Sequence, residues 1–457
     1  GKIALKKILD KNYDYFLNTN SNEYISTLTK KMEYTVTAVQ SLFNSISALL
    51  ILIVVFLTFL FYLPYLAIPI ILTSIILYSL VIFVVKKQLK KNSIDVSYNQ
   101  NILVKILNES LEGIREVIIN KLQNYFYDRY YKSDYKMRRA LAKNYFINTL
   151  PRFLFELVIM ILLVVVAVII TFKGLSINTF LPIFGVVILG AQRSLPHLQQ
   201  FYWGISYIIG THDSIKSTVD ILNLKDNDTT SKIQIKFEKK IELKNISFKY
   251  SLEDKNIINN INLEIFKNNF YTLVGRSGIG KTTLIEIIMG LLQPTKGNLL
   301  IDECELTAKE LPNWHSKIAY VPQNIFISDK TLAENIAYGV NFNDIDFKKI
   351  QEVSRLSEIN EIIDSKEKGN LSILGERGVK LSGGQLQRIG IARALYKNAE
   401  IIILDEITSA LDYSTEKKII SLVKNLSKTK TIIFVTHKKT IAEMSDIILD
   451  LEELNKS

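Results

Sequence analysis

The sequence has one cysteine in 457 residues, Cys304, so a disulfide within the chain is excluded. A single cysteine is typical of a protein that works in a reducing compartment or in a membrane. A disordered chain is excluded as well, because hydrophobic residue types make up 48% of the sequence and the mean hydropathy is +0.17. At about 100–200 residues per domain, the length predicts two or three domains.

Two stretches, 46–63 and 65–85, lack charged residues altogether. Each suffices to cross a bilayer core of about 30 Å, which needs about 20 apolar residues. Pro64 lies between them, where a reversal loses no helical hydrogen bond. With two later apolar runs, they predict an α-helical transmembrane domain over residues 1–225, with spans at about 42–63, 65–85, 153–172 and 175–209. The alternative, core helices of a soluble domain, is disfavoured because four such runs exceed what one soluble core uses.

The net charge of +11 indicates either nucleic-acid binding or the cytoplasmic bias of Lys and Arg in membrane proteins. Fourteen basic residues lie between the second and third spans, whereas the connections on the other side hold only Lys173. Residues 86–152 and both chain ends are therefore predicted to be cytoplasmic. Because this asymmetry accounts for much of the charge, we expect no nucleic-acid partner, and cationic arms that bind DNA are the alternative.

The cytoplasmic segment 86–152 is predicted to be helical, because it has no proline before Pro151, a single Gly113 and apolar residues at a helical period. We expect two helices that continue from the membrane and are joined by an aromatic-rich turn at Lys121–Tyr131. The segment is then either a contact element that docks on a cytoplasmic domain or simply the core of a helix hairpin.

Polar residues at 226–231 predict a linker, and residues 232–457 predict an α/β domain. Short β-rich runs alternate there with helical stretches, which favours a mainly parallel sheet with helices on its faces. The predicted strands are Ile241–Tyr250, Phe270–Val274, Lys317–Pro322, Ile401–Leu404 and Thr431–Thr436.

Gly275–Thr282, with the sequence GRSGIGKT, fits the phosphate-binding loop G-x-x-x-x-G-K-[ST] between a strand and a helix. Its glycines let backbone N–H groups surround phosphate oxygens, and the helix N-terminus adds partial positive charge. Lys281 is predicted to reach the β- and γ-phosphates, and the Thr282 hydroxyl to bind Mg²⁺. ATP and Mg²⁺ are therefore the expected ligands.

Two further motifs support this site. Ile401–Glu406 is an apolar strand that delivers Asp405 to the sheet edge where α/β proteins bind ligands, so Asp405 is predicted to hold magnesium and Glu406 to polarise the attacking water. Leu381–Gln385, with the sequence LSGGQ, forms a second anion cradle at a helix start, with Ser382 as a phosphate donor. An ordinary helix cap is the alternative for Ser382. Two cradles in one chain suggest nucleotides held between two copies.

Together these motifs resemble the ATP-binding domain of ABC transporters, and the order of membrane domain and ATPase resembles an ABC exporter over essentially the whole chain. The resemblance implies a second ABC subunit, with a homodimer expected, and two ATPs held head to tail in a cell membrane, the bacterial inner membrane. It implies catalytic roles for Glu406, His437 and Gln323, and metal binding by Thr282, Gln323 and Asp405. The residues implied to bind nucleotide are Tyr250, Gly275, Arg276, Ser277, Gly278, Ile279, Gly280, Lys281, Thr282, Thr283, Ser382, Gly383, Gly384, Gln385 and Asp412.

The sequence departs from the exporter pattern in its number of spans, four against the six expected. Tyr13–Leu28 resembles the segment between the family's second and third membrane helices, so we expect the first two to be missing. Gly375–Gly378 matches a segment of exporters that touches the membrane domain.

The substrate is less well defined by the sequence. Arg193 in the last span predicts attraction of an anionic head group. Separately, the segments PRFLFE and AQRSLP resemble those of exporters that flip lipid-linked oligosaccharides. Alternatively, Arg193 pairs with Glu156 or reaches the membrane interface. A peptide or drug exporter and, more remotely, a soluble ABC ATPase that acts on nucleic acid are the other hypotheses.

Overall fold

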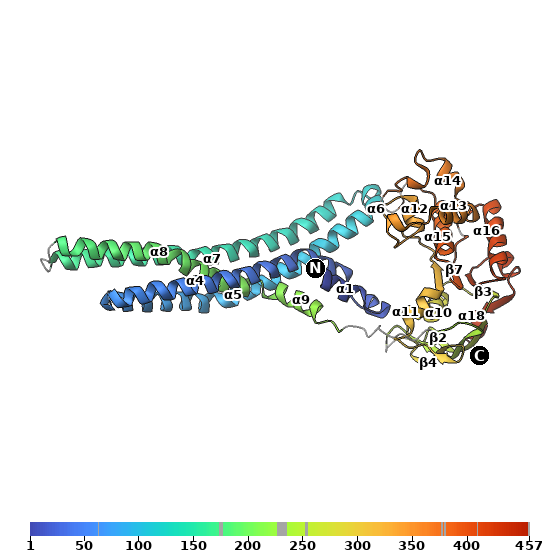
Figure 1. Cartoon of the computed structure of the whole chain (residues 1–457), viewed down its shortest axis with the longest axis horizontal. Coiled ribbons are helices and arrows are strands. Elements are labelled where there is room, and N and C mark those ends of the chain that lie inside the picture. The colour runs from blue at the N-terminus through green and yellow to red at the C-terminus, as the bar shows by residue number, and fades with distance from the viewer. Residues whose placement is uncertain are drawn as a thin grey trace. The chain divides into compact units, whose positions relative to one another are not determined.

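The computed structural model describes residues 1–62, 64–172, 177–225, 235–251, 255–375, 378, 381–408 and 410–455. Contacts within the chain divide it into two compact units (Figure 1). The helical unit comprises Gly1–Lys11 and Tyr15–Asp226, and the α/β unit comprises Asn12–Asp14 and Asn227–Ser457. The predicted linker at 226–231 lies outside the described residues.

Long helices build the helical unit. In chain order the helices of this part of the sequence are α1 (Lys2–Leu9), α2 (Tyr13–Leu17), α3 (Ser21–Ser26), the π-helix η1 (Thr27–Lys31), α4 (Met32–Tyr62), α5 (Pro64–Glu112), α6 (Ile114–Ile119), α7 (Gln123–Phe172), α8 (Ile177–Gly210) and α9 (His212–Leu222). The four predicted spans lie in α4, α5, α7 and α8. Helix α4 packs mainly on α8, and α5 on α7.

Two helical stretches among the described residues, Ser21–Tyr62 and Ile71–Glu112, are long and apolar enough to cross a membrane by length and composition. Only 17% and 11% of their most apolar windows are buried within the chain. A core helix of a soluble domain would bury most of such a window, so this exposure favours contact with lipid or another protein surface. Residues 173–176, which include the first two residues of the fourth predicted span, lie outside the described residues, and the number of four spans stays a prediction.

The predicted helical nature of residues 86–152 is confirmed, but the predicted turn at Lys121–Tyr131 is correct only for Lys121 and Leu122. The reversal occurs earlier, at Gly113, the short helix α6 and Asn120–Leu122, where Lys121 has a left-handed φ of 53°. Residues from Gln123 onward continue as helix α7, because their aromatic side chains fit a helix surface as well as a turn. Arg129 then pairs with Glu109 across the two long helices at 3.1 Å.

The α/β unit contains two sheets instead of the single sheet that was predicted. Its strands are β1 (Lys240–Phe248), β2 (Ile258–Phe266), β3 (Phe270–Val274), β4 (Lys296–Ile301), β5 (Cys304–Glu305), β6 (Ile318–Val321), β7 (Ile401–Asp405), β8 (Thr431–Val435) and β9 (Ile447–Asp450). Five form a parallel sheet in the order β6–β7–β8–β3–β9, and four form an antiparallel sheet in the order β2–β1–β4–β5. The predicted strand Ile241–Tyr250 belongs to the antiparallel sheet, whose other strands the prediction missed.

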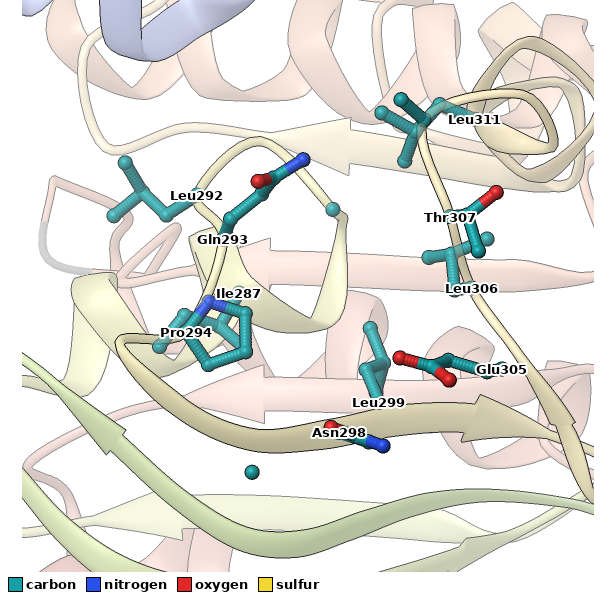
Figure 2. A pocket seen from close by; sticks show the side chains of 13 residues that line it. Ile287, Leu292, Gln293, Pro294, Asn298, Leu299, Glu305, Leu306, Thr307 and Leu311 are labelled. Atoms are coloured by element: carbon teal, nitrogen blue, oxygen red, sulfur yellow. The ribbon is translucent and has the colours of Figure 1, made fainter.

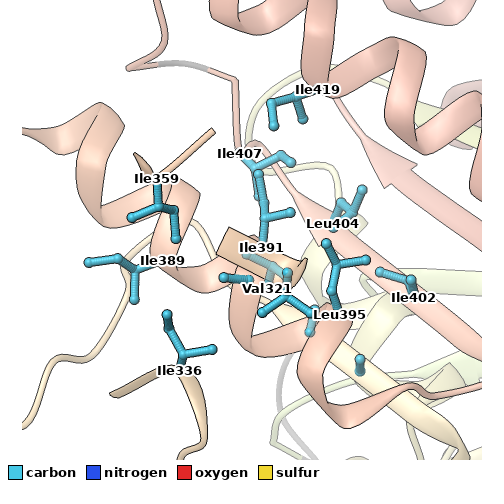
Figure 3. Close-up of a cluster of buried hydrophobic side chains, with 14 of the residues drawn as sticks. Val321, Ile336, Ile359, Ile389, Ile391, Leu395, Ile402, Leu404, Ile407 and Ile419 are labelled. Atoms are coloured by element: carbon cyan, nitrogen blue, oxygen red, sulfur yellow. The ribbon is translucent and has the colours of Figure 1, made fainter. Parts of the chain in front are cut away.

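Helices cover the parallel sheet and its edges. They are α10 (Lys281–Ile288), α11 (Leu311–Lys317), α12 (Leu332–Ile336), α13 (Phe347–Leu356), α14 (Asn360–Asp364), α15 (Gly383–Lys397), α16 (Tyr413–Leu426), α17 (Lys439–Ala442) and α18 (Leu451–Leu454), with 3-10 turns η2 (Phe342–Asp344) and η3 (Gly369–Leu371). Strand β7 is buried on both faces: Ile402 and Leu404 belong to one hydrophobic core, drawn in Figure 3, and Ile401 and Ile403 to the other. Burial on both faces explains why parallel strands read as continuous apolar runs.

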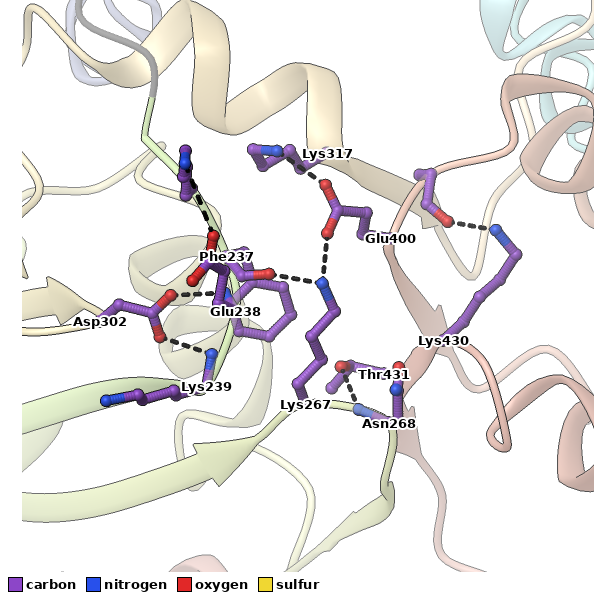
Figure 4. Close-up of polar contacts among 12 residues, drawn as sticks. Phe237, Glu238, Lys239, Lys267, Asn268, Asp302, Lys317, Glu400, Lys430 and Thr431 are labelled. Atoms are coloured by element: carbon purple, nitrogen blue, oxygen red, sulfur yellow. Dashed lines mark hydrogen bonds and ion pairs between the residues drawn. The ribbon is translucent and has the colours of Figure 1, made fainter.

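Polar contacts hold the amino-terminal ends of the parallel strands (Figure 4). Glu400, just before β7, accepts hydrogen bonds from Lys267 at 2.8 Å and Lys317 at 2.7 Å. In the antiparallel sheet, Asp302, which follows β4, accepts hydrogen bonds from the backbone N–H groups of Lys239 and Lys240 at 2.8 and 2.7 Å. The contacts of Glu400 occupy the amino-terminal edge of the parallel sheet. Open α/β sheets bind ligands at the opposite, carboxyl-terminal edge.

A cavity of about 270 Å³ lies between the end of α10 and strands β4 and β5 (Figure 2). Its lining includes Ile287, Gly290, Leu299 and Leu306, and it contains no residue of the predicted phosphate loop. It is therefore separate from the site described next.

Candidate active site

The predicted phosphate loop connects β3 to α10, as its sequence requires. Lys281 is the first residue of α10, and Gly280 before it has a φ of 107°. A Cβ at Gly280 would lie 2.7 Å from Ile257 Cγ2, so a side chain there would meet both backbone strain and a clash. The loop is pinned at its start by Arg276, whose Nε lies 2.7 Å from Glu452 Oε1.

Lys281 is held inside this loop. Its Nζ donates to the carbonyls of Gly275 at 2.8 Å and Arg276 at 3.1 Å, and the side chain is buried. Burial lowers the pKa of Lys281, while the carboxylates of Glu406 and Asp405 act in the opposite direction. A buried ammonium is stabilised by nearby negative charge, so the position suits a lysine that binds phosphate.

Asp405 ends β7 and is buried, and the hydroxyl of Tyr320 donates to its Oδ2 at 3.2 Å. Burial raises the pKa of Asp405, as does the charge of Glu406, whereas the hydrogen bond from Tyr320 lowers it. No group of three or more His, Cys, Asp or Glu residues that would hold a metal by itself occurs among the described residues. A single carboxylate such as Asp405 fits Mg²⁺, which is usually held by one or two carboxylates and takes its remaining ligands from water and substrate phosphates.

Glu406 lies at the centre of a chain of polar contacts. Its Oε2 accepts a hydrogen bond from Gln323 Nε2 at 3.0 Å, and its Oε1 lies 2.8 Å from His437 Nε2. Lys281 Nζ lies 3.1 Å from the same His437 nitrogen. The backbone of Glu406 is left-handed, with a φ of 50°, and its N–H donates to the carbonyl of Val435 at 3.1 Å. The structure thus connects the three predicted catalytic residues in a row of contacts, and the last of them, His437, lies beside the predicted phosphate-binding Lys281.

Tyr250 follows β1 and is tied to helix α10. Its hydroxyl lies 3.2 Å from Thr283 Oγ1, and its ring contacts Phe248 edge to face with centroids 5.0 Å apart. The side chain is 48% exposed, which leaves ring surface available for the stacking on adenine implied by the resemblance. Thr283 itself is buried, so it supports Tyr250 from inside the domain.

The segment Ser382–Gln385 caps helix α15. Ser382 Oγ accepts from Gln385 N at 3.3 Å and Gln385 Oε1 accepts from Ser382 N at 2.9 Å, so both sides of a capping box are formed. A Cβ at Gly384 would lie 2.9 Å from the Ala410 carbonyl, and one at Gly383 would lie 3.1 Å from Ala410 Cβ. The two glycines of this segment therefore pack closely against Ala410, two residues before Asp412.

Asp412 is the N-cap of α16 and accepts from Ser414 Oγ and from Thr415 N at 3.0 Å. The hydrogen bond from Ser414 is the main reason that the pKa of Asp412 is held well below its usual range. Of the predicted segment Gly375–Gly378, only the two glycines lie within the described residues, with φ of 78° and 64°.

No motif in the sequence singles out Tyr320, the partner of Asp405. Tyr320 sits in β6 three residues before Gln323, and the register of the parallel sheet pairs it with Ile403, two residues before Asp405. Only the order of the strands reveals this proximity, since 85 residues separate Tyr320 from Asp405 along the chain.

In the helical unit, the alternative pairing of Arg193 with Glu156 is wrong. Glu156 pairs with Arg152 at 2.8 Å, one helical turn away on α7. Arg193 is exposed on α8 and makes no ion pair within the part of the chain that the structure describes.

Comparison with known proteins identifies relatives of both units. Residues 258–409 match the family model described as ABC transporter, and residues 2–188 match that of the ABC transporter transmembrane region. The heterocyst differentiation ATP-binding protein HepA of Nostoc sp. is 30% identical over 444 residues, which covers 96% of this chain and 72% of HepA.

Other relatives are ATP-dependent lipid A-core flippases. Those of Photobacterium profundum and Bordetella avium are 33% and 35% identical over 61% and 47% of this chain, which spans 47% and 36% of their own lengths. A solved structure of a bacterial Atm1-family ABC exporter with ATP bound has the same fold, with a TM-score of 0.83 at 21% identity over 98% of this chain and 79% of that one.

Proposed function

The chain belongs to the ABC transporter family as an exporter-type protein in which ATP hydrolysis is coupled to transport, and we propose that Glu406 is the base of this hydrolysis. It is a membrane protein with its ATPase domain in the cytoplasm. The contact of both Glu406 oxygens with Gln323 and His437 carries the proposal, because a base must be ionised and aimed before it accepts a proton.

Each residue of the site has a distinct part in the proposed reaction. Lys281 and the loop N–H groups bind the phosphates of ATP, and Tyr250 stacks on its adenine. Glu406 accepts the proton of the attacking water, and His437, beside Lys281, contacts the γ-phosphate. Thr282, Asp405 and Gln323 would hold Mg²⁺, which neutralises phosphate charge when bound.

The second phosphate contact is proposed to come from a second copy of the chain, as a homodimer. Ser382–Gln385 of one copy would close the site formed by Gly275–Thr282 of the other, and Asp412 would line the interface. Support comes from the position of this segment at the N-terminus of α15, where the helix carries partial positive charge that attracts phosphate. The capping box engages the N–H groups of Ser382 and Gln385 and fixes the conformation of the segment. Domain limits of 1–225 and 232–457 and a bacterial inner membrane location belong to the same proposal.

The substrate is proposed to be an anionic lipid, such as a lipid-linked oligosaccharide, which alternating access moves between leaflets. Two observations support it: Arg193 is exposed on α8, and the lipid A-core flippases are relatives. An arginine at membrane depth costs about 2.5–3.5 kcal/mol on insertion scales, and this cost favours a position facing a polar cavity or head group.

We expect the full-length protein in nanodiscs to hydrolyse ATP faster when an anionic lipid-linked sugar is present. Arg193→Ala should reduce this stimulation about tenfold and leave the basal ATPase rate unchanged. Arg152→Ala serves as a control, because its charge is already paired with Glu156. Equal stimulation of the two variants, or stimulation by apolar drugs or peptides alone, would exclude the anionic lipid.

A further inference from the structure

Helix α15 lies directly on the loop that carries Gln323. This loop, 322–330, connects β6 to α12. A Cβ at Gly390 of α15 would lie 2.5 Å from Ile325 Cδ1 and 3.0 Å from Val321 Cγ1. Glycine allows this close approach, and a larger residue would force the Ile325 side chain to shift. Because the contact is close-packed, displacement of the loop also displaces the helix.

One turn further along the same helix, Arg393 clamps the loop. Its Nε donates to the carbonyl of Asn335 at 2.9 Å and its Nη2 to the carbonyl of Phe326 at 3.0 Å. The guanidinium also lies 4.8 Å from the ring centroid of Tyr338. A planar fork is what allows one side chain to bridge two carbonyls in this way, and lysine has no such fork.

The far side of the clamp is rigid. Asn335 of α12 is fully buried, and its side chain accepts from Ser328 N at 3.0 Å and donates to the Ser328 carbonyl at 3.1 Å. The loop and α12 are therefore joined to each other by hydrogen bonds, and Arg393 binds both. Its contact with the loop is at Phe326, three residues after Gln323. Because α15 has 15 residues and a rise of about 1.5 Å each, the helix transmits movement of the loop and α12 to its first residues as a rod.

Those first residues follow Ser382, which the proposed function assigns to the ATP site of the other copy, whereas Gln323 belongs to the site of its own copy. We propose that Arg393 is a positioning residue that couples the two ATP sites of the dimer through helix α15. The inference rests on the proposed function. When Gln323 moves in one site, the clamp moves α15 and with it Ser382 in the other.

A matched control lies on the same helix. Arg388 is also largely buried, but its Nη1 donates to the Glu358 carbonyl at 2.7 Å, at the end of α13, and not to the loop. Lysine at 388 loosens α15 without releasing the loop, whereas lysine at 393 keeps the charge and loses the bridge. A comparison of R393K with R388K therefore separates coupling from general stability of the helix.

The experiment measures ATPase rate against ATP concentration for the full-length protein in nanodiscs. We expect a Hill coefficient above 1 for the unaltered protein, and in R393K a coefficient near 1 with kcat about threefold to tenfold lower and KM within about twofold. R388K should keep kcat and the Hill coefficient within about 1.5-fold of the unaltered values, which is within the effect of an uncoupled substitution.

A second pair of variants tests the contact between Gly390 of α15 and Ile325 of the loop. This test does not require R393K to fold. G390A places a methyl group against Ile325 Cδ1 and should reproduce the loss of cooperativity. I325V removes that Cδ1 atom, so G390A/I325V should recover at least half of the lost kcat.

Three results would overturn the inference. They are a Hill coefficient of 1 in the unaltered protein, unchanged cooperativity in both R393K and G390A, and an equal loss in R388K. The E406Q variant, measured alongside, distinguishes this failure from that of the proposed function. If E406Q is inactive while R393K matches the unaltered protein, only the coupling is wrong; if E406Q retains full turnover, the assignment of the site fails and the inference fails with it.

Discussion

Glu406 has a backbone conformation that is unfavourable for glutamate. This conformation predicts that replacing Glu406 can remove activity without reducing the stability of the fold. The φ of 50° at Glu406 places a non-glycine residue in the left-handed region. Such a conformation costs about 1–2 kcal/mol for most residues. A residue retained at that cost must supply something else, which here is proposed to be the catalytic carboxylate. We therefore expect replacement of Glu406 to abolish turnover without weakening the fold.

The magnitudes can be estimated for Glu406→Gly. Release of the left-handed strain gains about 1–2 kcal/mol, whereas the extra entropy of glycine in the unfolded chain costs about 0.5–1 kcal/mol. The lost contacts with Gln323 and His437 together cost about 0–1 kcal/mol, since Gln323 is exposed, the Glu406 and His437 side chains are 25% and 45% exposed, and solvent screens these interactions. The sum, counted positive for stabilisation, lies between about −1 and +1.5 kcal/mol, so Tm should fall by no more than about 2–4 °C.

The assay compares E406Q and E406G with the unaltered protein. Loss of a general base lowers kcat by about 10²–10⁴-fold, so both variants should fall at least 100-fold. Equilibrium binding of labelled ATP should change less than about threefold, because Lys281 and its carbonyl partners are untouched. Full turnover by E406Q would refute the catalytic role, and a drop in Tm of E406G far beyond 4 °C would refute the strain argument.

Two further predictions follow from single contacts. Tyr320→Phe removes the hydrogen bond that lowers the pKa of Asp405, so the pKa of Asp405 should rise further. The acid limb of the pH profile of kcat/KM should then move to higher pH. An acid limb that does not move would show that Asp405 is not the group that titrates there. Burial raises the pKa of Asp302, but hydrogen bonds from three backbone N–H groups outweigh this effect and leave the pKa below its ordinary value of 3.8. The ionised Asp302 carboxylate therefore stabilises the folded state above pH 3.8, and this stabilisation is lost as the pH falls through the lower pKa of the folded state. Asp302→Asn should therefore lower the unfolding free energy by about 1–2 kcal/mol at pH 7 and by less near pH 3, as measured by denaturant unfolding of the full-length protein.

Four of the five parallel strands, β3, β6, β7 and β8, were predicted to within one residue, because each is a largely buried apolar run. The edge strand β9 was missed, and its Ile447 and Ile448 are exposed. The antiparallel sheet was missed, although β2 carries a signal: Ile261, Leu263 and Ile265 alternate with exposed polar residues. Alternation of this kind predicts a strand with one solvated face. A mainly parallel sheet with helices on both faces contains no strand with a solvated face, so the alternation in β2 was not interpreted as a strand.

Two features of the helical unit could not be read from local residue types. Lys30 and Lys31 are adjacent, yet Lys30 is exposed and pairs with Glu33, whereas Lys31 is buried and donates to Ser217 at 3.3 Å. The π-helix η1, which ends at Lys31, sets which lysine faces inward. A sequence pattern based on 3.6 residues per turn does not register that insertion.

The geometry of the candidate site depends on strand order, which the motifs do not contain. In the sequence, the four contacting residues occur in the order Lys281, Gln323, Glu406 and His437. In the sheet, the strands that precede them lie in the order β6–β7–β8–β3, which gives Gln323, Glu406, His437 and Lys281. This is also the order of their side-chain contacts, at 3.0, 2.8 and 3.1 Å. Neighbouring strands lie about 4.8 Å apart, so each side chain reaches only the next one. The polar chain is thus a direct consequence of the parallel sheet, and a change in strand order would separate Glu406 from at least one partner while leaving every motif intact.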